Sequence, residues 1–182
     1  MAADSGSPFC NATSSNLNSH LPVVDKRELL SSIIAQLERE LELYGQSARA
    51  AHAEATHEQN KAENKYDTRG LEASYLAHGQ SRQAAETEQA RQHFVSLAVR
   101  EFGPSDAIDL GALVELELHG APSWYFIGPR AGGMEIELGA HEILIITPQS
   151  PLGAQVLGRK QGDRLKIAVG GRQEEYRVSS VA

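Results

Sequence analysis

The sequence predicts an α+β protein in which an N-terminal antiparallel helical hairpin precedes a small, mostly antiparallel sheet domain with one short helix. Two observations predict this class. Apolar residues recur at helical spacing over two long runs, 26–60 and 67–102. Short apolar segments separated by Gly and Pro turns then fill 108–181. The predicted parts of the chain are a tail over 1–24, a coiled-coil hairpin over 25–103 and the sheet domain over 104–182.

The tail is rich in Ser and Asn, and this composition predicts disorder because little apolar surface is available to offset the entropy of ordering. It lacks the basic start and apolar centre of a signal peptide. Cys10 is the single cysteine, so no disulfide can form within the chain. A reducing, cytoplasmic location is therefore expected.

The first helix is expected to start at Asp25, which can cap it, with Glu28 placed to reach back. A stripe of larger apolar residues then follows at helical spacing: Leu30, Ile33, Ile34, Leu37, Leu41 and Tyr44. Beyond Gly45 the stripe thins to the alanines Ala48, Ala51, Ala55 and Ala62. Alanine has strong helix propensity and lets a partner helix approach closely, so a slender element is expected.

The second helical run has a weaker apolar seam, formed by Leu71, Tyr75, Ala85, Ala90, Phe94 and Leu97. Gly103-Pro104 is expected to end it. The turn between the two helices is expected within Asn60 to Gly70. An alternative remains open, in which the hairpin is half of a larger bundle completed by a second copy of the chain.

The C-terminal segment alternates strands and turns. Strands are expected over Ile108–Leu118, Ser123–Ile127, Met134–Leu138, Glu142–Thr147, Leu165–Val169 and Glu175–Val181. Met134–Leu138 alternates apolar and acidic residues, which is typical of an exposed edge strand. Glu142–Thr147 is the most apolar and is expected in the interior of the sheet. Gly170-Gly171 can join the last two strands as a tight hairpin.

A short helix is expected between the fourth and fifth strands. Ser150 can cap it, and Pro151 can open it because a proline at the first position loses no helical hydrogen bond. Gly158 can close it, and Gly162-Asp163 turns the chain into the next strand.

The stretch from Leu110 to Val181 resembles the C-terminal domain of the Gre transcript-cleavage factors. The two share, in order, a strand, Ser-Pro, a helix of small residues, a Gly-Lys-like turn, Gly-Asp, a strand, Gly-Gly and a last strand. The resemblance implies an FKBP-like fold for this domain. It also implies docking on the rim of RNA polymerase near the secondary channel. The docking residues that it implies are Ser150, Pro151, Leu152 and Gly153.

The resemblance places the chemistry at the tip of the hairpin. In the Gre family an Asp and a Glu there are thought to hold a Mg²⁺ ion in the polymerase active centre, and oxygen ligands suit that ion. Glu63-Asn64 matches the family's Glu-Asn pair, but the family Asp falls on the neutral Asn60. Asp67 is the nearest replacement. The same residues also fit a solvated helical turn of alternating charge without any site.

The function expected from the resemblance is that of an elongation factor, not of an enzyme in its own right. RNA polymerase is the expected partner, with transient contact to nascent RNA and no membrane, and a monomer is expected. No cofactor or metal of its own is expected, although polymerase Mg²⁺ can be shared by Glu63 and Asp67. The net charge of -7 argues against a general nucleic-acid coat. Two alternatives stay open: a regulator that occupies the channel without cleavage, and a dimeric interaction module unrelated to transcription.

Overall fold

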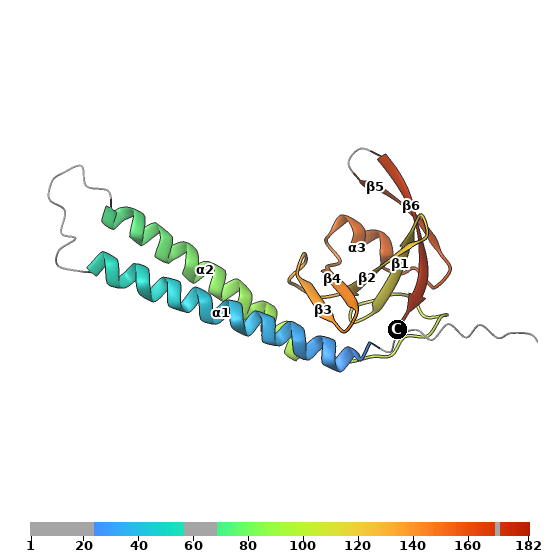
Figure 1. The fold of residues 1–182 in the computed structure, drawn as a ribbon, viewed down its shortest axis with the longest axis horizontal. Helices are drawn as coiled ribbons and strands as arrows, with labels where there is room; N and C mark the ends of the chain where they lie inside the picture. The colour runs from blue at the N-terminus through green and yellow to red at the C-terminus, as the bar shows by residue number, and fades with distance from the viewer. Residues whose placement is uncertain (1–23, 57–68, 170–171) are drawn as a thin grey trace, which may run out of the picture.

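The computed structural model describes residues 24–56, 69–169 and 172–182 of the chain. Two long helices come first, α1 (Lys26–Thr56) and α2 (Arg69–Val95). The remaining elements are β1 (Leu113–Leu118), β2 (Ala121–Ile127), β3 (Glu135–Leu138), β4 (His141–Ile146), α3 (Pro151–Val156), β5 (Arg164–Val169) and β6 (Arg172–Val181). Figure 1 shows α1 and α2 side by side, projecting away from the sheet domain. The predicted α+β class is confirmed.

The start of α1 and most of its predicted stripe are confirmed. The Asp25 carboxylate accepts a hydrogen bond of 2.8 Å from the backbone N–H of Arg27, as expected of a cap. Leu30, Ile33 and Leu37 are buried. Leu29 is also fully buried although the predicted stripe left it out, because the base of the hairpin packs on the sheet as well as on α2. Burial on two sides widens the apolar face of a helix.

The predicted end of the second helix is wrong, because α2 ends at Val95 and not at Phe102. Its last turn closes with a hydrogen bond of 3.2 Å from the Leu97 N–H to the Phe94 carbonyl. The chain then runs without helical structure to Phe102, which is buried in the core on the far side of the sheet. An extended chain covers about twice the distance per residue of a helix, and this extension lets Phe102 reach that core.

The predicted seam of α2 is only partly right. Ala90 and Phe94 are buried as expected. Tyr75 is 70% exposed, and Ala85 is exposed as well. Thr87 is buried in their place, since it lies one turn from Ala90 and two turns from Phe94 on the same side of α2. The buried residues therefore concentrate at the base of the hairpin.

The six strands form one mixed sheet in the order β3-β4-β2-β1-β6-β5. All neighbouring pairs are antiparallel except β2 and β4, which pair in parallel. β3 lies at an edge and β4 is flanked on both sides, as predicted. β1 starts at Leu113 and not at Ile108, because Ile108 pairs instead with Arg159 and Gly158 beyond α3. Gly170-Gly171, predicted to join β5 and β6, lies outside the described residues.

Each face of the sheet carries its own apolar core. One core joins the base of the hairpin to the sheet and includes Phe94, Leu113, Phe126 and Ile143. The other lies between the sheet and α3 and includes Val156 with residues of β1, β5 and β6. Because successive residues of a strand point to opposite faces, neighbours such as Leu113 and Val114 serve different cores.

A charged side chain ties the start of the hairpin to the segment that follows α2. Lys26 is buried, and its ammonium donates a short hydrogen bond to the Arg100 carbonyl. The same ammonium lies 4.9 Å from the centre of the Phe102 ring, and the Arg100 guanidinium lies 4.6 Å from it. Burial lowers the pKa of Lys26, while the Glu101 carboxylate acts in the opposite direction. These contacts bring the first turn of α1 against the connection to the sheet.

Candidate functional site

The start of α3 forms a compact turn around Ser150, as the sequence predicts. The Ser150 hydroxyl accepts a hydrogen bond of 3.0 Å from the Gly153 N–H and donates one of 2.8 Å to the Thr147 carbonyl. Pro151 occupies the first helical position and is exposed. One hydroxyl thus satisfies both a helix N–H and the last carbonyl before the turn, which holds the turn rigid.

Gly153 is required at its position by sterics. A Cβ atom there would lie 2.0 Å from the Thr147 carbonyl oxygen and 2.9 Å from the Ser150 hydroxyl. Leu152 is half-buried and packs against the core between the sheet and α3. Of the four predicted docking residues, Pro151 is the one most open to solvent, and Ser150 and Gly153 shape the turn that presents it.

The predicted tip residues Glu63 and Asp67 lie in 57–68, outside the described residues, as does Asn60. The ends that flank this segment are described: α1 ends at Thr56 and α2 begins at Arg69. Figure 1 shows both of these ends far from the sheet, at the outer end of the hairpin. The roles of Glu63 and Asp67 therefore stay predictions.

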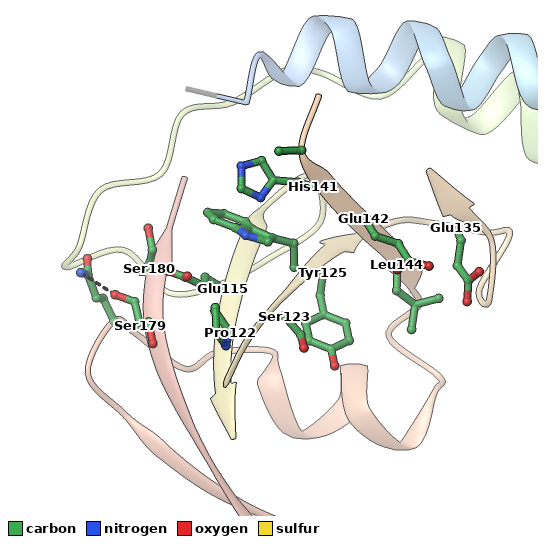
Figure 2. A pocket seen from close by; sticks show the side chains of 13 residues that line it. Glu115, Pro122, Ser123, Tyr125, Glu135, His141, Glu142, Leu144, Ser179 and Ser180 are labelled. Carbon is green, nitrogen blue, oxygen red and sulfur yellow. Dashed lines mark hydrogen bonds between the residues drawn. The ribbon is translucent and has the colours of Figure 1, made fainter. Parts of the chain in front are cut away.

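A hollow of about 850 Å³ is lined by residues of both sheet faces and was not predicted from the sequence. The register places three of its side chains in one row across neighbouring strands, because Glu115 of β1 lies opposite Trp124 of β2 and Ser180 of β6. Directly opposite residues share a face of an antiparallel pair. The His141 ring contacts the Trp124 indole edge to face, with centroids 5.4 Å apart. Figure 2 shows His141, Glu115, Ser179 and Ser180 around this part of the hollow.

The Glu115 carboxyl is the unusual group of the hollow. It is half-buried, and no hydrogen bond or ion pair joins it to another residue in the described part of the chain. Burial and the neighbouring Glu117 carboxylate raise the pKa of Glu115, while His141 acts in the opposite direction. Glu117 itself accepts a hydrogen bond of 3.3 Å from the Ser179 hydroxyl. The alternation of Leu and Glu in β1 was the sequence signal for both carboxylates.

Among the described residues, no group of His, Cys, Asp and Glu side chains is arranged to hold a metal ion. None of the helices in the described ranges has the length and apolar character needed to cross a membrane.

The comparisons with known proteins give structural similarities only. No protein-family model matches the chain, and no curated protein matches it. Among solved structures the chain is similar to the GreA factor homolog 1 (Gfh1) of Thermus thermophilus, with 23% identity over 84% of this chain and 94% of that chain and a TM-score of 0.34. The Gfh1 of Thermus aquaticus shares 24% identity over 86% and 93% of the two chains, with a TM-score of 0.35.

A third similar structure is the elongation factor GreA/GreB of Nitrosomonas europaea, with 16% identity over 53% of this chain and 78% of that chain and a TM-score of 0.32. At TM-scores this low the superpositions set no detailed correspondence of residues. The function is therefore proposed from the chain's own residues.

Proposed function

We propose that this chain is a Gre-like elongation factor that binds RNA polymerase, with the hairpin in the secondary channel and the sheet domain at the rim. The main observation in support of the proposal is that the hairpin is slender and packs against the sheet at one end only. Its base shares a core with the sheet, whereas Leu43, Tyr75 and Leu76 further out are exposed. The 31 residues of α1 give a helix about 46 Å long, a length suited to reaching into another molecule.

The second support is the turn at α3, which belongs to the segment that resembles the Gre family. Ser150, Pro151, Leu152 and Gly153 form a rigid, partly exposed corner on the face of the sheet opposite the hairpin base. A rigid corner loses little conformational entropy on binding and so suits a docking contact. In this proposal the corner holds the sheet domain on the polymerase while the hairpin enters the channel.

In the cleavage form of the proposal, Glu63 and Asp67 share a polymerase Mg²⁺ and help to activate water for hydrolysis of backtracked RNA. Stalled elongation complexes mixed with the protein should then shorten their RNA from the 3′ end. Glu63→Ala combined with Asp67→Ala should reduce the rate of shortening by about 10²-fold or more, because the second metal loses its protein ligands. Glu42→Ala, an exposed acid nearer the base of the hairpin, is the matched control and should leave the rate unchanged.

A channel-occupying regulator without cleavage is the second candidate, and Asn60 in place of the family Asp favours it. An amide is a weaker Mg²⁺ ligand than a carboxylate. In that case the wild-type protein shortens no RNA but competes with a cleavage factor for the polymerase, and Asn60→Asp gives a gain of cleavage. A tight dimer in sedimentation that buries Leu43, Tyr75 and Leu76, together with no binding to polymerase, would instead support the dimeric interaction module.

A further inference from the structure

We propose that the hollow beside Glu115 is a binding site for an arginine side chain presented by a partner protein. The hollow reaches both faces of the sheet. Glu115, Trp124 and Ser180 line it on the face that carries the hairpin base, whereas Tyr125 and Leu144 pack against the core on the α3 side. Its volume of about 850 Å³ falls within the range of about 300–1,000 Å³ that is usual for ligand sites. It is thus large enough for one long side chain and its flanking backbone.

Charge is the first argument for a cationic occupant. Among the described residues that line the hollow, Glu115 is the carboxyl group on the face of the Trp124 indole, and none of the lining residues is Lys or Arg. Glu135 and Glu142 share the opposite sheet face with Leu144, and Figure 2 shows them away from Glu115. A half-buried carboxylate without a cation or a hydrogen-bond donor is unfavourable, and a cation that enters the hollow would remove that cost.

The Ser180 hydroxyl is the second, independent argument. Ser180 is only 4% exposed, and its hydroxyl makes no hydrogen bond to another described residue. In the described part of the chain, every side-chain polar atom that is shut off from solvent has a hydrogen-bond partner, so the Ser180 hydroxyl is not shut off. The hydroxyl is therefore open to the hollow and free to accept a hydrogen bond. Because Ser180 lies directly opposite Glu115, the two acceptors stand side by side in the row.

Arginine fits this row better than lysine does. A guanidinium offers five N–H donors in a plane, so that it can donate to the Glu115 carboxylate and the Ser180 hydroxyl together. Its flat face can also lie against the Trp124 and His141 rings, which meet at the same hollow. An ammonium would contact the carboxylate as a point charge and gain less from the aromatic pair.

The chain's own N-terminal segment does not supply this arginine. Residues 1–24 contain neither Lys nor Arg, and the first basic residue, Lys26, is held at the Arg100 carbonyl and the Phe102 ring. The other ranges outside the described residues, 57–68 and 170–171, also contain no Arg, and no Arg lines the hollow, so the occupant is assigned to another protein molecule. This inference does not rest on the proposed transcription function, because it concerns the opposite face of the sheet from the docking corner.

The test uses the fluorescence of Trp124, the single tryptophan of the chain, in the full-length protein. N-acetyl-argininamide is titrated at constant ionic strength, and the neutral isostere N-acetyl-citrullinamide serves as the control ligand. The arginine probe should give a saturable change with half-saturation in the millimolar range, and the citrulline probe should not. No saturable change with either probe, or equal changes with both, would overturn the assignment.

Two variants make the test specific. Glu115→Gln should weaken binding of the arginine probe at least tenfold, while Glu137→Gln, an exposed acid on β3 that does not line the hollow, should leave it unchanged. Glu115→Gln should remain folded, because burial already disfavours the ionised form of Glu115. Its thermal unfolding midpoint at pH 7 checks this. A folded Glu115→Gln variant that binds the probe as tightly as wild type would refute the site.

Discussion

Replacing Phe94 with alanine is expected to destabilise the protein by about 3–5 kcal/mol, the usual cost of removing a buried aromatic side chain. Phe94 is 1% exposed and sits in the core that joins the hairpin base to the sheet. Its ring lies so close to Gly128 that a Cβ there would be 2.9 Å from the ring. Such tight packing leaves little room for the surroundings to collapse into the cavity.

The Phe94→Ala effect should appear first as loosening of the hairpin from the sheet. Denaturant unfolding measures the loss of stability, and limited proteolysis should cut the segment 97–103 faster than in the wild type. Tyr75→Ala is the matched control on the same helix, because Tyr75 is 70% exposed and its loss should change stability by less than about 0.5 kcal/mol. Similar destabilisation by both variants would contradict the view that the hairpin is anchored at its base only.

Replacing Gly153 with alanine is expected to cost about 2–3 kcal/mol and to lower the unfolding midpoint by roughly 5–10 °C. The added methyl group would lie 2.0 Å from the Thr147 carbonyl oxygen, which belongs to the backbone and cannot swing aside. The turn must open, and the two hydrogen bonds of the Ser150 hydroxyl would weaken with it. Thermal unfolding followed by circular dichroism gives the measurement.

Gly79→Ala supplies the control for Gly153→Ala. Gly79 lies in α2, and an added Cβ there would meet no atom within 4 Å. Alanine is favoured over glycine inside a helix by up to about 1 kcal/mol, so this variant should be slightly more stable than wild type. If Gly153→Ala also unfolded at the wild-type temperature, the close approach at the α3 corner would not be a constraint, and its use as a rigid docking element would lose its basis.

The two variants separate the parts of the proposed function. Phe94→Ala disturbs the support of the hairpin and leaves the contacts of the α3 corner in place, since the two lie in different cores. Gly153→Ala disturbs the α3 corner and leaves the support of the hairpin in place. If the protein acts on polymerase through both parts, the first variant should impair the effect on RNA more than binding, and the second should impair binding itself.

Much of the fold could be predicted from local patterns. The stripe of Leu30, Ile33 and Leu37 predicts a helix because its spacing matches one turn, and the Ser150-Pro151 pair predicts the start of α3 because capping depends on neighbours alone. The end of α2 could not be predicted in this way. Helical spacing continues to Phe102, whereas in the structure α2 stops at Val95 and the Phe102 ring is buried in the core on the other face of the sheet.

The candidate sites also differ in how far the sequence alone could predict them. By itself the sequence determined which segments are helices and strands and in what order they follow, and it placed Ser150, Pro151, Leu152 and Gly153 at one corner. Only the tertiary structure decided that Ser180, Glu115 and Trp124 form one row. A register shift between β1 and β6 at Glu115 sets which serine faces that carboxylate, and strand register depends on contacts between residues distant in sequence.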